Sequence, residues 1–155
     1  MEPLVRVAQP EDVDRLALLR WNMHAEDSAP AEDYESFLGR FRMFAKPALD
    51  STAWRVSVAE LDEIIVGNLW LQLVTRVPRP INAASSALGY LTNVYVEPPY
   101  RDLGLGSRML REIVDWCREQ AIGVVVVWPS ERSTDYYRRQ GFRESDALQL
   151  SLKED

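Results

Sequence analysis

Residues 100–109, YRDLGLGSRM, place an arginine, two glycines and a serine at the start of a helical pattern. The first turn of a helix presents backbone N–H groups without intrahelical partners, together with the positive end of the helix dipole. Glycines let the backbone come close to a ligand and adopt positive φ angles. Arg101 can add a charge-assisted contact, and Ser107 can add a hydroxyl group. These residue types in this order suit the binding of a diphosphate.

Three phosphate-binding patterns are candidates for this segment. The P-loop pattern GxxxxGK[ST] is excluded because no lysine follows a second glycine at that spacing. The dinucleotide pattern GxGxxG is excluded because Met109 stands where the third glycine is required. The pattern [RQ]xxGx[GA] matches in full over residues 101–106. A loop that merely opens a helix would also explain these six residues taken alone.

The longer stretch VYVEPPYRDLGLGSRML resembles the strand–loop–helix consensus of the GNAT superfamily of N-acetyltransferases, with Pro98, Tyr100 and Arg101 in register. A second family motif, Y-x-x-x-G-F, is matched downstream by residues 137–142, YRRQGF. The resemblance implies an acyltransferase that uses acetyl-coenzyme A as co-substrate and wraps its pyrophosphate with the glycine loop. The implied cofactor-binding residues are Val94, Tyr95, Val96, Arg101, Asp102, Leu103, Gly104, Leu105, Gly106, Ser107 and Ser130.

The resemblance also implies the catalytic groups. Tyr137 occupies the position of the family's proton donor to the departing thiolate, a role for which a phenol is chemically suited. Backbone N–H groups of Val94 and Val96 are expected to polarise the thioester carbonyl. Ser130 matches a serine of one subgroup, although Ser133 stands where that subgroup has glycine. Ser130 therefore either contacts coenzyme A or caps the following short helix.

The acceptor side is less defined. The family's frequent glutamate base would fall at or near Tyr90, so no simple general base is present there. Four residues are candidates for contact with the acceptor: Arg20, Trp21, His24 and Asn93. For three of them a structural role is the alternative to acceptor contact. His24 could be a surface histidine, Trp21 could be a core residue, and the Arg20 side chain could cover apolar surface. The sequence leaves the acceptor amine open, with a small molecule favoured.

The composition restricts the class of partner. The chain has 155 residues, a net charge of -6 and a pI of about 4.9, and no basic face for nucleic acid is visible. No run of apolar residues is long enough for a membrane span. Cys117 is the one cysteine, so a reducing cytoplasm is the expected location. No metal site is indicated, because histidines and cysteines do not cluster. A homodimer remains open.

The elements that must position these residues follow from hydrophobic periodicity. We expect one N-acetyltransferase domain over 1–155, with an α/β (α+β sandwich) fold of the GNAT type. It has a mixed, largely antiparallel sheet, a βαβ crossover and helices on both faces. Strands are predicted at 4–7, 54–60, 64–75, 88–96, 123–128 and 147–152, helices at 13–24, 34–44, 104–120 and 133–140, and a loop at 76–86. An acyl-coenzyme A sensor without catalytic activity is the alternative on the same fold.

Overall fold

The structure, a computed structural model, describes residues 2–81 and 87–153. In these residues a five-stranded sheet has the order β1-β2-β3-β4-β5. The first four strands are antiparallel to their neighbours, and β5 is parallel to β4. The mixed, largely antiparallel sheet predicted from the sequence is therefore confirmed. The strands are β1 (Leu4–Val7), β2 (Trp54–Leu61), β3 (Ile64–Thr75), β4 (Ala87–Val96) and β5 (Val125–Val127).

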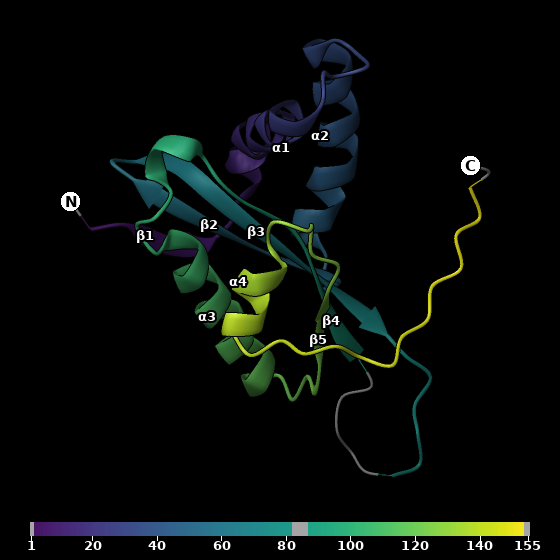
Figure 1. Cartoon of the computed structure of the whole chain (residues 1–155). Helices are drawn as coiled ribbons and strands as arrows, with labels where there is room; N and C mark the ends of the chain where they lie inside the picture. The colour runs from purple at the N-terminus through teal and green to yellow at the C-terminus, as the bar shows by residue number, and fades with distance from the viewer. Residues whose placement is uncertain (1, 82–86, 154–155) are drawn as a thin grey trace.

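Helices cover both faces of the sheet (Figure 1). On one face lie α1 (Val13–Asp27) and α2 (Tyr34–Asp50), and on the other α3 (Leu105–Glu119) and α4 (Thr134–Arg139). Because α3 connects the parallel strands β4 and β5, the predicted βαβ crossover is confirmed. Two short 3₁₀ turns, η1 (Pro10–Asp12) and η2 (Pro98–Tyr100), precede α1 and the glycine loop.

Helix α3 is held on the sheet by one apolar face. Its buried side chains recur at spacings of three and four residues, as the helical period requires: Leu105, Met109, Leu110, Ile113 and Cys117. Burying a side chain of this size contributes roughly 1.5–3 kcal/mol. This packing fixes the first turn of α3 against the end of β4, where the site is built.

Two predicted boundaries on α2 and β5 are wrong. We expected the second helix to stop before Pro47, but α2 continues to Asp50. Proline removes one backbone donor near the end of the helix, while burial of Ala45 and Ala48 keeps the last turn against the core. The strand predicted at 123–128, buried on both faces, is only Val125–Val127, and these residues are half-buried because β5 is an edge strand.

The strand predicted at residues 147–152 is also wrong. This segment has no regular secondary structure and runs away from the sheet after α4 (Figure 1). Leu148, Leu150 and Leu152 are 100%, 82% and 88% exposed. Alternating leucines give the sequence pattern of a strand, but a strand forms only where a partner supplies hydrogen bonds. The predicted loop at 76–86 lies partly outside the described residues.

None of the helices within residues 2–81 and 87–153 has both the length and the apolar character needed to cross a bilayer.

Candidate functional site

The site begins at a bulge in β4. Asn68 of β3 is opposite Tyr95, but Trp70 is opposite Thr92, so two residues of β4 face one residue of β3. Asn93 lies within the bulge with a φ of 51°, a conformation that asparagine tolerates better than most residues. The bulge changes which way the remaining β4 residues point. It also lies where the pairing between β4 and β5 has already ended.

Beyond this point one edge of β4 has no neighbouring strand within the described residues. Among the same residues, β5 pairs only with Gly89, Tyr90 and Leu91. The Glu97 N–H donates to the Val66 carbonyl of β3 at 2.9 Å. Because successive residues of a strand direct their backbone groups to opposite sides, the groups of Val94 and Val96 face away from β3, toward the open edge. A ligand lying along this edge would meet them as it would meet a neighbouring strand.

The glycine loop meets the open edge at the start of α3. Gly104 is the N-cap residue and has a left-handed conformation with a φ of 78°. Asp102 also has a positive φ, 65°. A Cβ atom placed on Gly106 would lie 3.9 Å from the Tyr136 hydroxyl and 4.0 Å from Val96 Cγ2. The backbone N–H groups of the first turn, including those of Leu105 and Gly106, have no intrahelical acceptor, which suits an anion.

Arg101 has a different set of contacts from the one its motif suggests. Its Nε donates to the Val96 carbonyl at 2.8 Å, and its Nη2 contacts both Glu26 carboxylate oxygens at 2.8 and 2.9 Å. The guanidinium also lies over the Tyr95 ring, 5.4 Å from the centroid. Arg101 therefore ties the loop to β4 and to the end of α1. The sequence did not indicate the Glu26 partner, which lies 75 residues away.

Two tyrosines of α4 lie beside the start of α3. The Tyr136 hydroxyl is hydrogen-bonded to Ser107 Oγ at 3.0 Å, so Tyr136 links α4 to the first turn of α3. Tyr137 is 7% exposed and its ring packs on Phe142 with centroids 5.4 Å apart. Burial, assisted by the neighbouring Tyr136, raises the pKa of Tyr137 to about 12. Tyr137 therefore keeps its proton well above neutral pH.

The other side of the bulge carries a chain of polar contacts. Arg20 donates to Asn93 Oδ1 at 3.3 Å, and Asn93 donates to Asn68 Oδ1 at 3.2 Å. The Trp70 indole N–H donates to the same Asn68 oxygen at 2.7 Å. Asn68 is fully buried, and its Nδ2 has no hydrogen-bond partner within the described residues. Arg20 and Asn93, both predicted from the sequence, thus meet; Asn68 was missed, since a lone asparagine in an apolar strand gives no pattern.

Other predicted residues lie apart from this cluster. Trp21 packs against Tyr34 and Phe37 of α2, with ring centroids 5.2 and 5.6 Å away, in the manner of a core residue. His24 is exposed at the end of α1. Ser130 is exposed and its hydroxyl contacts that of Ser133, the N-cap residue of α4, at 2.9 Å.

The carboxylate of Glu97, the residue that follows β4, is held in an ion pair. Its carboxylate accepts from Arg15 Nη2 at 3.0 Å. Beside it, a shallow cavity of about 390 Å³ lies between the end of α1 and the end of β4, lined by residues that include Asn22, Glu26 and Tyr95. In the part of the chain that the structure describes, no group of three or more His, Cys, Asp or Glu side chains is arranged to hold a metal ion.

The chain is similar to known proteins in both sequence and structure. The family model described as the acetyltransferase (GNAT) family matches residues 14–142. A Trypanosoma brucei brucei protein named glucosamine 6-phosphate N-acetyltransferase is 30% identical over 79 residues, covering 51% of this chain and 51% of that protein. The matched part thus spans about half the length of this curated relative.

Solved structures share the fold at low sequence identity. A Clostridium acetobutylicum protein, described as a predicted acetyltransferase with acetyl-CoA, superposes with a TM-score of 0.82 at 24% identity, covering 97% of both chains. A GCN5-related N-acetyltransferase from Ralstonia eutropha superposes with a TM-score of 0.81 at 20% identity, covering 97% of this chain and 99% of that one.

Proposed function

Because this chain belongs to the acetyltransferase (GNAT) family and is thus an acyltransferase, we propose that it transfers the acetyl group of acetyl-coenzyme A directly to an amine of a small molecule. The observation that carries the proposal is that the open edge of β4 lies next to the first turn of α3, where Gly104 and Gly106 leave the backbone N–H groups accessible. Bound there, the thioester supplies a carbonyl group that an amine can attack.

The residues present fit this co-substrate. Backbone N–H groups at Leu105, Gly106 and Ser107 would hold the diphosphate. Gly106 has no side chain, so the ligand can come close to the backbone there. Backbone groups of Val94 and Val96 would pair with the extended arm of the ligand and polarise its carbonyl group. Arg101 would position the loop through Val96 and Glu26. Asp102, Leu103, Gly104, Tyr95 and Ser130 complete the proposed binding residues.

Tyr137 is the proposed proton donor. Its raised pKa keeps it protonated at the pH at which an amine acceptor begins to lose its own proton. Arg20 and Asn93 lie on the α1 side of the bulge, and we assign them to acceptor contact. Glu97 is paired with Arg15, so no carboxylate is assigned as general base. The acceptor then reacts as the free amine that solvent provides, and the rate rises with pH.

Thiol release measures this function. Acetyl-coenzyme A would be incubated with a panel of amines, including glucosamine 6-phosphate, amino acids, aminoglycosides and peptide N-termini. Calorimetry with coenzyme A would run alongside. We expect amine-dependent thiol release and saturable binding of coenzyme A. A failure to bind coenzyme A at millimolar concentration would overturn the proposal.

A sensor without catalytic activity is the second candidate, favoured by the unavailability of Glu97 as a base. It predicts coenzyme A binding without turnover across the whole panel, and a Tyr137→Phe variant that behaves as the wild type in every assay.

A further inference from the structure

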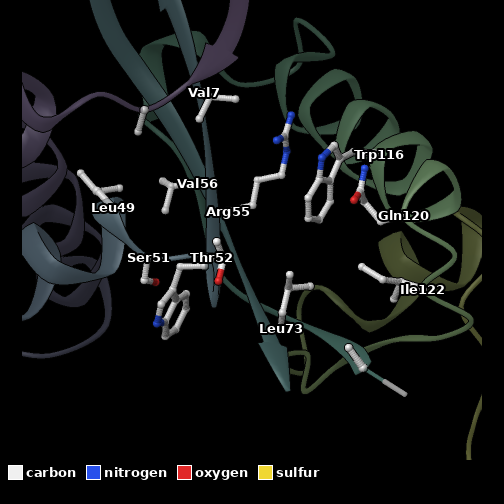
Figure 2. A pocket seen from close by; sticks show the side chains of 13 residues that line it. Val7, Leu49, Ser51, Thr52, Arg55, Val56, Leu73, Trp116, Gln120 and Ile122 are labelled. Atoms are coloured by element: carbon white, nitrogen blue, oxygen red, sulfur yellow. The ribbon is translucent and has the colours of Figure 1, made fainter. Parts of the chain in front are cut away.

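A second cavity, of about 480 Å³, lies at the other end of α3 from the glycine loop. It is bounded by the end of α2, the first residues of β2 and the last turn of α3 (Figure 2). From Gly106 to Trp116 the helix advances about 15 Å along its axis, at 1.5 Å per residue. The two sites therefore share a helix but no lining residue.

Arg55 is the one charged side chain among the described residues that line this cavity. Its guanidinium lies over the Trp116 ring, 4.5 Å from the centroid. Figure 2 shows the Arg55 side chain extending beside the Trp116 ring of α3. Arg55 is half-buried, yet it makes no ion pair and no side-chain hydrogen bond with any residue in 2–81 or 87–153. By contrast, Arg6 and Arg15, similarly half-buried, each pair with a carboxylate.

The polar groups of the cavity are chiefly donors. The guanidinium carries five N–H donors in a planar fork, and the Trp116 indole N–H has no acceptor among the described residues. Gln120 and Thr52 add an amide and a hydroxyl group. Among the described residues that line the cavity none is a carboxylate, although the protein as a whole has a net charge of -6. A group that only accepts hydrogen bonds and carries one negative charge is the chemical complement.

The rest of the lining is apolar, with Leu49, Val56, Leu73 and Ile122 as its main side chains. A volume of this size is typical of sites for small organic ligands. A single guanidinium can pair with a carboxylate in bidentate geometry and balances its one negative charge. A phosphate dianion bound to the same fork would keep one negative charge without a partner.

We propose that this cavity is a binding site for a small organic monocarboxylate with an aliphatic or aromatic body. Its carboxylate binds Arg55 beside Trp116, and its apolar part lies against Leu73 and Ile122. The site is separate from the acetyl-transfer site, so its existence does not depend on the proposed function.

The test uses the full chain with three probes, benzoate, 3-phenylpropanoate and hexanoate, and their uncharged amides. Binding is followed by calorimetry and by the NMR signals of the tryptophan indole N–H groups. We expect at least one carboxylate to bind and to shift the signals of Trp54 and Trp116, which line the cavity, but not those of Trp21 and Trp128. The matched amide should bind at least tenfold more weakly.

Variants separate the site from nonspecific binding. Arg55→Met keeps the length of the side chain and removes the fork, so affinity should fall about ten- to a hundredfold. Arg55→Lys keeps the charge and should lose part of that affinity. Arg118→Met, at an exposed arginine near the same end of α3, is the control and should bind as the wild type. Saturating coenzyme A should not displace the probe.

Each opposite result overturns the proposal. These results are no binding of any carboxylate to the wild type, equal affinity in Arg55→Met, signal changes at Trp21 or Trp128 instead, or competition with coenzyme A. If Arg55→Met fails to fold, the Arg55→Lys affinity and the indole signals of the wild type still decide the question.

Discussion

The two glycines of the loop should respond to alanine in opposite ways. Gly104 has a φ of 78° and open space around the position of a Cβ atom. Alanine there meets no atom but must hold a left-handed conformation, which costs about 1–2 kcal/mol. For a chain of this size we expect the Tm to fall by roughly 2–8 °C.

Gly106→Ala should instead leave the free protein intact. The new methyl group meets its nearest atoms at 3.9 and 4.0 Å, which is ordinary van der Waals contact, and Gly106 has no positive φ. Alanine is the better helix former, so the free energy of unfolding should rise by up to about 0.5–1 kcal/mol. The methyl group does, however, occupy the space that a diphosphate must approach. Loss of one charge-assisted hydrogen bond weakens coenzyme A binding about ten- to a hundredfold.

Thermal unfolding and calorimetry with coenzyme A measure both effects on the same samples. Gly39→Ala is the matched control, because Gly39 lies within α2 and a Cβ atom placed on it would meet no atom within 4 Å outside the helix backbone. It should be stabilised to a similar extent as Gly106→Ala and bind coenzyme A with unchanged Kd. If Gly106→Ala binds as tightly as the wild type, close backbone approach at this residue does not hold the diphosphate, and our account of the loop is wrong.

Three further predictions concern Tyr137 and the C-terminal segment. Tyr137→Phe should lower kcat about 10²–10⁴-fold while the Kd for coenzyme A stays within about twofold, and unchanged turnover would remove Tyr137 from the mechanism. Because burial raises the pKa of Tyr137 to about 12, this proton donor stays protonated as the pH rises. The rate should therefore increase with pH, reach a plateau and show no decrease at any pH up to about 11. A decrease in rate near pH 9 would indicate that a different group is the acid. Brief trypsin treatment should cleave after Arg143 and leave the Tm unchanged, since the leucines beyond it are exposed, and a lower Tm would show that the segment packs on the sheet.

The sequence was sufficient for features that depend on neighbouring residues. The strand–loop–helix unit around Gly104 was predictable because glycine spacing and helical periodicity are local signals. The last predicted strand, at 147–152, was wrong. The alternation of apolar and polar residues indicates which side chains a strand would bury, but it does not indicate whether a neighbouring strand is present. Pro47 was misjudged because its local cost is smaller than the burial of the turn that follows it.

Contacts between distant segments could not be predicted in this way. Asn93 is hydrogen-bonded to Asn68, which is 25 residues away in the sequence, and Arg101 is hydrogen-bonded to Glu26, which is 75 residues away. Neither pair has a spacing rule, because their approach depends on the register of β3 with β4 and on the angle of α1 across the sheet. The bulge that brings Asn93 to Asn68 is an irregularity of pairing, which no pattern in a single strand reveals.

This bulge also links the two halves of the proposed reaction. The extra residue in β4 leaves the Asn93 side chain on the α1 side, bonded to Arg20 and Asn68, while the backbone groups of Val94 and Val96 face the open edge. The acceptor side and the donor side are therefore consecutive residues of one strand. A change at Asn93 that shifts the backbone must move the groups assigned to the thioester as well. It follows that changes in acceptor preference are more easily made through Arg20, whose side chain is exposed and whose backbone belongs to α1, than through β4 itself.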